Sequence, residues 1–286
     1  MHADQAEGLR RLLDRSALRV VSISAGSGTA TATINLAGAL AELGSDVLIL
    51  DAHPATQGVT AALGLQPRFD LEDVIRRSCN LDEVIVRGPA GIRILPLARG
   101  ASSLAQLPAS EQQRLVDRCG RLGFPVDTLL VDAAPRGAGA LAWRGSAAQE
   151  VIVIAGCGAA AITAAYASIK RLSNEPMRRD FRVLISDVAS ESEARTIFEN
   201  VCAVARRYLR VTLHFMGHVP PDEKLRRAAQ LRLPVVAAFP GAAAAGSFRH
   251  LAQAVSGWPR AEEEDSGFDD FMRRLIDSNG QRAAAA

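Results

Sequence analysis

The stretch that decides the fold lies near the start of the chain and reads Arg19-Val20-Val21-Ser22-Ile23-Ser24-Ala25-Gly26-Ser27-Gly28-Thr29-Ala30. Its first half is a short apolar run typical of a buried strand, and a helical pattern follows over residues 31–43 and ends before Gly44. A strand, a glycine-containing loop and a helix in this order can bind phosphate through backbone N–H groups and the helix N-terminus. The sequence therefore predicts a phosphate-binding loop in which Gly26 and Gly28 allow a close approach of the backbone.

Outward from this stretch, short apolar runs alternate with longer helical patterns, which is typical of βαβ units. We expect an α/β fold with a doubly wound, mostly parallel sheet of about seven or eight strands flanked by helices. The predicted strands are residues 19–24, 46–51, 92–97, 128–132, 150–155, 182–187 and 211–216.

Composition narrows the classes of function. The 286 residues carry 33 basic and 31 acidic side chains, a net charge of +2, so no global field favours nucleic acid, and we expect no direct nucleic-acid contact. A polar start and the lack of a bilayer-length apolar run predict a cytoplasmic protein. No metal site is expected, since the cysteines are widely spaced and the neighbouring histidines lie on a predicted strand: Cys79, Cys119, Cys157, Cys202, His214 and His218.

The loop after the first strand resembles the deviant Walker motif K-G-G-x-G-K-[ST] of the MinD/ParA ATPases, a P-loop family. In that comparison Ser24 stands at the signature lysine, Thr29 at the phosphate-binding lysine and Ala30 at the hydroxyl that holds magnesium. The resemblance implies a degenerate nucleotide site for ATP or ADP at Gly26, Ser27, Gly28, Thr29 and Ala30, in which magnesium is not expected.

Two further strand ends resemble family elements. Asp51-Ala52-His53 is similar to the D-x-D element, with His53 at the acid that positions the attacking water, and Asp132 matches the second magnesium acid. The resemblance implies that Asp51 and Asp132 belong to the nucleotide site and that no catalytic residue remains. Ser186-Asp187 and the loop at 219–223 fall where relatives contact adenine. Whether these positions are only turns of a stable scaffold or still bind nucleotide stays open at this point.

Several stretches resemble one branch of the family in particular, the flagellar-number regulators FlhG and FleN. They are residues 63–68, 80–86, 88–96 and 217–223. The N-terminus adds a separate signal, because residues 4–10 match the D-Q-A-x-x-L-R activator helix of that branch. The resemblance implies that this helix docks on FlhF, a GTPase of the signal-recognition-particle type. Gln5 would be presented near the nucleotide, Asp4 and Arg10 would be polar anchors, and Ala6 and Leu9 the apolar docking face. The alternative is an ordinary frayed amphipathic terminus.

The C-terminal segment has an acidic linker followed by an apolar helical stripe. Phe268, Phe271, Met272 and Leu275 lie on this stripe, and as in the family's membrane-targeting helix they would enter the interfacial layer at the inner face of the plasma membrane. The other interpretation is packing on the domain or on a partner. We therefore divide the chain into an activator helix at 1–16, a MinD/ParA-like domain at 17–258, and a linker with an amphipathic helix at 259–286, and we expect the core to end before the linker.

Two functions of different classes follow. The first is a pseudo-ATPase scaffold that stimulates the flagellar GTPase through its N-terminal helix and helps to set flagellar number or placement. The second is a working ATPase switch that dimerises around ATP. A flagellar transcription activator as a further partner is compatible with both.

Overall fold

The computed structural model describes residues 18–24, 28–53, 56–104, 107–132, 150–174, 178–258 and 267–283. They form an eight-stranded sheet in the order β3-β4-β2-β5-β1-β6-β7-β8, parallel except where β3 pairs antiparallel with β4. The strands are β1 (Arg19–Ser24), β2 (Val47–Asp51), β3 (Val86–Arg87), β4 (Arg93–Pro96), β5 (Thr128–Asp132), β6 (Glu150–Gly156), β7 (Asp180–Ser186) and β8 (Thr212–Val219).

The predicted α/β class is thus confirmed, and each predicted strand is present within a few residues of its expected bounds. The strand without a prediction is β3, which has two residues at the edge of the sheet. Two residues are too few to show an alternation of apolar and polar side chains.

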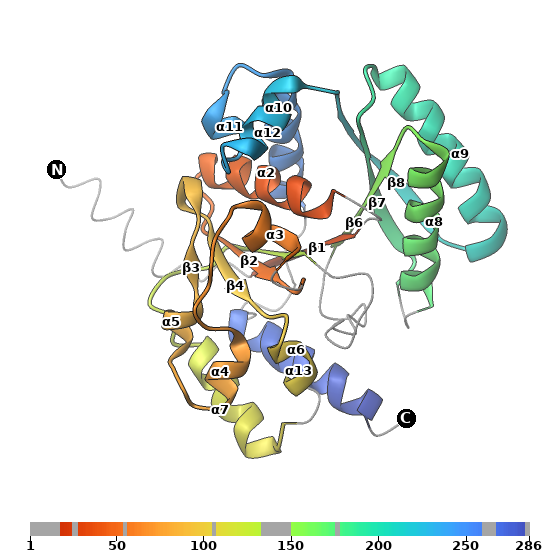
Figure 1. Cartoon of the computed structure of the whole chain (residues 1–286). Coiled ribbons are helices and arrows are strands. Elements are labelled where there is room, and N and C mark those ends of the chain that lie inside the picture. Colours follow the sequence, from red (N-terminus) through yellow and green to blue (C-terminus); the bar gives the residue numbers. More distant parts are fainter. Residues whose placement is uncertain are drawn as a thin grey trace, which may run out of the picture.

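Helices cover both faces of the sheet (Figure 1). One face is covered mainly by α2 (Thr29–Glu42), α3 (Gly58–Ala62), α10 (Glu223–Gln230), α11 (Val235–Ala238) and α12 (Ala243–Ser256). On the opposite face, one layer is formed by α4 (Leu71–Ile75), α5 (Leu81–Val84), α6 (Gly100–Leu104), α7 (Ala109–Cys119) and α13 (Phe268–Ala283). Further along that face lie α8 (Ala159–Ser173) and α9 (Glu191–Leu209).

The register of the central strands brings two acids together. Asp51 is the last residue of β2 and pairs with Asp132, the last residue of β5, while Ile23 of β1 pairs with Asp132 on the other side. Side chains alternate along a strand, and Asp51 follows Val47 and Ile49 onto the face that α2 covers. The carboxyl ends of the strands, next to the start of α2, are where ligands bind in open α/β sheets.

Helix α2 is held in place by contacts that only small or polar residues allow. Asn35 Oδ1 accepts a hydrogen bond of 2.6 Å from the backbone N–H of Val235, and Asn35 Nδ2 donates to the carbonyl of Thr31. At Gly38 a Cβ atom would lie 2.6 Å from Cβ of Pro234, closer than real side chains approach. The start of α2 is therefore fixed against the strand ends by packing further along the helix.

The C-terminal helix α13 belongs to the core, contrary to the expectation that the core ends before the linker. Phe268 is 6% exposed and Phe271, Met272 and Leu275 are fully buried, in one cluster with the apolar side of α7 and of strands β2 and β5. The rings of Phe268 and Phe271 stack with centroids 6.2 Å apart. Of the two interpretations of this stripe, the structure shows packing on the domain, so these side chains are not presented to lipid. An apolar stripe has the same sequence pattern in both cases.

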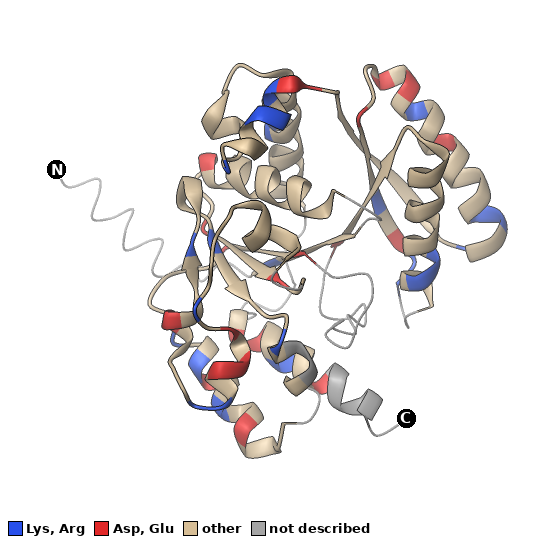
Figure 2. Ribbon diagram, in the orientation of Figure 1, with Lys and Arg blue, Asp and Glu red and all other residues tan. Residues whose placement is uncertain are grey.

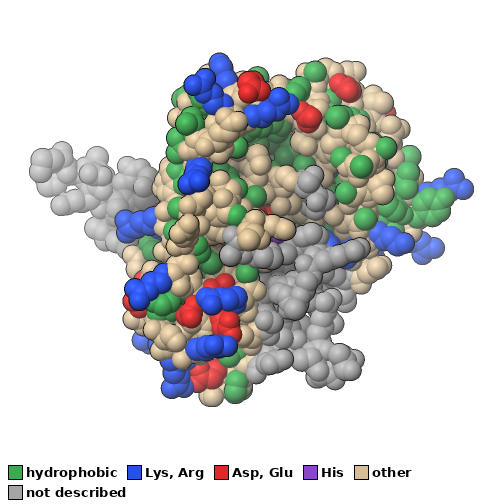
Figure 3. All heavy atoms as spheres, in the orientation of Figure 1, with side chains coloured by type: hydrophobic (Ala, Val, Ile, Leu, Met, Phe, Trp, Pro, Cys, Tyr) green, Lys and Arg blue, Asp and Glu red, His purple; other side chains and the backbone are tan. Residues whose placement is uncertain are grey.

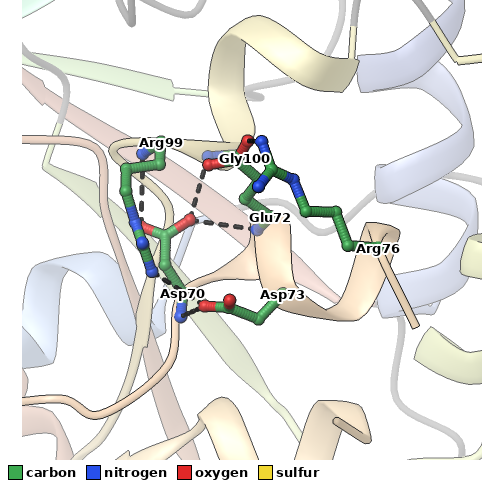
Figure 4. Close-up of polar contacts among 6 residues, drawn as sticks. All are labelled: Asp70, Glu72, Asp73, Arg76, Arg99 and Gly100. Atoms are coloured by element: carbon green, nitrogen blue, oxygen red, sulfur yellow. Dashed lines mark hydrogen bonds and ion pairs between the residues drawn. The ribbon is translucent and has the colours of Figure 1, made fainter. Parts of the chain in front are cut away.

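An acid cluster joins α4 to α6 in this same layer (Figure 4). Asp70 caps α4 by accepting from the N–H of Glu72, and its carboxylate also accepts from the N–H groups of Arg99 and Gly100. Asp73 in turn accepts from the N–H of Asp70 and from the guanidinium of Arg99. Reciprocal bonds of this kind satisfy the free N–H groups at a helix start.

Charged side chains lie mainly on the helices, and those of the strands lie at or near the strand ends (Figure 2). On the face drawn in Figure 3, basic and acidic groups are interspersed over the α4 to α7 layer. No helix of the described residues is long and apolar enough to cross a bilayer.

Candidate functional site

The strand ends hold a buried cluster of three ionisable side chains. Asp51, His53 and Asp132 are 1%, 7% and 0% exposed. His53 Nδ1 lies 3.4 Å from Oδ2 of Asp132 and 3.8 Å from Oδ1 of Asp51. The sequence predicted the two acids as a pair and His53 as the residue that replaces a third acid. It gave no sign that the imidazole would lie between the two carboxylates.

Asp51 is held rigidly by the turn that follows it. Its Oδ2 accepts from the N–H of Thr60 at 2.8 Å and from the Thr60 hydroxyl at 2.7 Å, while Oδ1 accepts from the N–H of His53 at 3.2 Å. Gly58 has a φ of +84°, and a Cβ there would clash with the Asp51 carboxylate and lie 2.6 Å from Cβ of His53. Thr60 and Gly58 are the site residues that sequence reasoning missed, because their role depends on how α3 folds back over β2.

Asp132, in contrast to Asp51, lacks hydrogen bonds to its carboxylate from the residues that the structure describes. Among the described residues, neither of its carboxylate oxygens has a hydrogen-bond partner, and the same holds for Nδ1 of His53. A buried polar atom without a partner costs roughly 1–3 kcal/mol, and a charged one costs more. Unsatisfied groups of this kind in a native fold call for an explanation through ligand binding or chemistry.

The surroundings shift the protonation of the cluster. Burial is the main cause that raises the pKa of Asp51, and the neighbouring charge of Asp132 acts in the same direction against the hydrogen bonds from Thr60 and His53. Burial by itself would lower the pKa of His53, but the carboxylates of Asp132 and Asp51 outweigh it and raise that pKa. The main causes of the two shifts differ, but both shifts favour the protonated form of the group. The cluster therefore favours a bound cation or proton.

The loop before α2 keeps a backbone suited to anions but lacks the expected side chains. Gly28 has a φ of +80° with open space where a side chain would stand, and α2 begins at Thr29 without a side-chain cap. Its first N–H groups can therefore donate hydrogen bonds to an anion. Thr29 is buried and Ala30 packs against the core. Gly26 and Ser27 lie outside the described residues.

Magnesium–ATP does not fit these residues as it fits the Walker motif. Thr29 supplies no positive charge for the phosphates, and Ala30 has no oxygen for the metal ion. At the strand ends the third side chain is an imidazole, whereas magnesium prefers oxygen ligands. At the signature-lysine position, the Ser24 hydroxyl accepts a long bond of 3.5 Å from the guanidinium of Arg171 of α8. These residues therefore lack the groups that hydrolysis of magnesium–ATP uses in the family.

The other predicted positions take structural roles or fall outside the description. Asp222 of the adenine-side loop caps α10 by accepting from the N–H of Lys224 and also accepts from the N–H of Ala244. Ser186 ends β7, and Asp187 follows it with a positive φ of 61°. The predicted activator residues Asp4, Gln5, Ala6, Leu9 and Arg10 lie outside the described residues.

A mostly parallel eight-stranded sheet, a glycine loop between the first strand and a long helix, and two acids at neighbouring strand ends define a P-loop nucleotide-binding domain of the MinD type. Residues 18–235 match the model of the CobQ/CobB/MinD/ParA nucleotide binding domain. The chain therefore belongs to that family.

Individual relatives agree with this assignment. The chain is 35% identical over 262 residues to the antiactivator FleN of Pseudomonas aeruginosa, covering 91% of this chain and 94% of that protein. It is 27% identical over 264 residues to the septum site-determining protein MinD of a Synechocystis species, covering 88% and 91%. Among solved structures, the MinD cell division protein of Aquifex aeolicus superposes with a TM-score of 0.62 at 20% identity, covering 86% of this chain and 99% of that one. The MinD of Pyrococcus horikoshii complexed with Mg-ADP gives 0.61 at 20% identity, covering 84% and 96%.

Proposed function

We propose that this protein is a MinD/ParA-type regulator of flagellar number or placement whose folded domain is a scaffold that does not turn over ATP. The observation that carries the second part is His53 buried between Asp51 and Asp132, at the position that the family gives to an acid. His53 thus takes the place of the carboxylate that positions the attacking water in the family, and its imidazole is held between two acids. The similarity to an antiactivator of the FleN branch supports the flagellar role.

The regulatory activity is assigned to residues 1–16, which bind and stimulate the flagellar GTPase FlhF. The match of residues 4–10 to the activator pattern supports this assignment and does not depend on the nucleotide site. A helix this short is marginal alone in water, so it folds on the partner with Ala6 and Leu9 buried. Gln5 then lies at the bound nucleotide and positions the attacking water. A flagellar transcription activator is a second partner consistent with the FleN relationship.

The GTPase assay tests the regulatory part. The full-length protein should accelerate the release of phosphate from GTP by FlhF. Gln5→Ala should remove most of this acceleration while binding persists, because the Gln5 side chain acts mainly in the transition state. Leu9→Asp should remove binding, since it places a charge in an apolar contact. Equal stimulation by wild type and Gln5→Ala would exclude the activator role.

The ATPase assay tests the scaffold part. The purified chain should release phosphate from ATP no faster than a buffer blank, with or without magnesium. A matched variant that carries Ser24→Lys, Thr29→Lys, Ala30→Thr and His53→Asp restores the four family side chains and shows whether the fold still supports turnover. Magnesium-dependent turnover by the wild type, abolished in Asp51→Ala, would contradict the proposal.

A second function, an ATP-dependent dimerising switch, is favoured by the retained acids and by the uncapped start of α2 at Gly28. It requires ATP to convert a monomer to a dimer. Light scattering with and without ATP separates the two functions, because the scaffold keeps one mass in both conditions.

A further inference from the structure

We propose that Asp51, His53 and Asp132 bind a divalent transition-metal ion directly, with Zn²⁺ as the best match, and that they do so without a nucleotide. Each side chain offers one ligand atom, and the three atoms lie within 4.8 Å of one another. Among the residues that the structure describes, this is the one such group of three. The inference does not depend on the flagellar role.

The distances between the ligand atoms fit a metal ion. Ligands placed about 2.0–2.2 Å from a tetrahedral ion lie roughly 3.4 Å from each other. His53 Nδ1 is 3.4 Å from Asp132 Oδ2 and 3.8 Å from Asp51 Oδ1, and all three ligand atoms lie within 4.8 Å of one another, so the side chains need to move closer together to bind the ion.

His53 lies within ion-pair distance of both acids, but these distances exceed those of charge-assisted hydrogen bonds. A hydrogen bond between an imidazolium and a carboxylate is about 2.7–2.9 Å long, and both contacts of His53 are longer. Within the described part of the chain, both oxygens of Asp132 and Nδ1 of His53 are left without hydrogen-bond partners at nearly complete burial. An ion at the centre would be bonded by His53 Nδ1 and by one oxygen of Asp132, two of these three atoms.

The surroundings hold the ligands as a binding site requires. Thr60 fixes Asp51 through two hydrogen bonds, which leave Oδ1 turned toward His53. Such bonds to a ligating carboxylate orient it and tune its affinity. Gly58 lets the turn that carries His53 lie directly against Asp51.

The donor set selects the kind of ion. One imidazole with two carboxylates suits Zn²⁺ and its first-row neighbours, whereas Mg²⁺ and Ca²⁺ prefer sites made of oxygen. Three protein ligands leave one tetrahedral position free for a water or a small anion. The replacement of an acid by His53 thus changes the preference of the site from magnesium to a transition metal.

Calorimetric titration of the untagged full chain with Zn²⁺, without nucleotide, tests the proposal. A Cys157→Ser background removes the thiol that is exposed among the described cysteines. We expect one Zn²⁺ per chain and no comparable binding of Mg²⁺. His53→Asn and Asp132→Asn should each weaken Zn²⁺ binding by more than roughly 10- to 100-fold, which is the loss caused by changing a residue that only supports a ligand. His53→Asp restores three carboxylates and should shift the preference toward Mg²⁺ or Mn²⁺. The matched control is His214→Asn, which removes an exposed imidazole that also lies 3.4 Å from a carboxylate, that of Asp180.

Co²⁺ absorption gives a second readout, since a tetrahedral site produces strong visible bands and ligation by nitrogen and oxygen lacks thiolate charge-transfer bands. These bands should appear in the wild type and in His214→Asn and be absent from His53→Asn. Circular dichroism checks that each variant is folded. If His53→Asn is unfolded, Asp132→Asn takes its place in the Co²⁺ assay. No binding by the wild type, or equal binding by wild type and folded His53→Asn, would overturn the proposal. The cluster would then hold a proton on His53 in place of a metal ion.

Discussion

Asp70 and Asp132 are both buried acids, 6% and 0% exposed, yet they are bonded in opposite ways. The carboxylate of Asp70 accepts three backbone hydrogen bonds and joins α4 to α6. Neither carboxylate oxygen of Asp132 accepts a hydrogen bond from any residue that the structure describes, and its close neighbour is His53. The first arrangement stabilises the fold. The second has a cost in stability that the fold alone does not explain, as expected at a binding site.

The layer that contains Asp70 should also show the largest effect of a single substitution. Phe271 of α13 is fully buried against α7, so Phe271→Ala should lower the free energy of unfolding by about 3–5 kcal/mol. Urea unfolding followed by circular dichroism measures this change.

Arg273→Ala is the matched control for Phe271→Ala, because this side chain is about half exposed on the same helix and forms an ion pair with Asp270. It should change stability by less than about 0.5 kcal/mol. A Phe271→Ala protein as stable as the wild type would mean that α13 leaves the domain in solution, which would restore the membrane interpretation of its stripe.

Substitutions of Asp70 and Asp132 should give the next largest changes in stability. Asp70→Ala removes a helix cap and leaves the N–H groups of Arg99 and Gly100 unsatisfied, so it should destabilise by about 2–4 kcal/mol. Asp132→Asn removes a buried charge without such bonds, and in metal-free buffer it should be neutral or stabilising by up to about 1 kcal/mol. Denaturant midpoints of the two variants, measured side by side, test the comparison. A strongly destabilised Asp132→Asn would show that Asp132 is structural.

The sequence was sufficient for the architecture and for part of the site. Seven strands were predicted because buried parallel strands are continuous apolar runs. Asp51 and Asp132 were predicted from the resemblance of two strand ends to family elements, and the structure pairs them at neighbouring strand ends. The stripe of α13 was seen, but its partner was not, since α7 and the strands it covers are far away in the sequence. The place of Thr60 and the position of His53 between two acids depend on the fold of the turn after β2, which no local pattern specifies.

The smallest effect on stability is expected at Asp222, a third acid, both of whose carboxylate oxygens accept hydrogen bonds. It accepts from the N–H groups of Ala244 and Lys224, and these bonds lower its pKa from the usual 3.8, the bond from Ala244 contributing most. This direction is opposite to the shift at Asp51, where burial raises the pKa.

A lowered pKa in the folded state means that Asp222 contributes stability above the unfolded value of 3.8 and loses it as the pH falls through the folded value. The stability difference between wild type and Asp222→Asn should therefore be constant at neutral pH and shrink as the pH falls below 3.8. Unfolding curves of both proteins across this range measure it, and a difference that grows with acid would show that these bonds do not favour the charged form of Asp222.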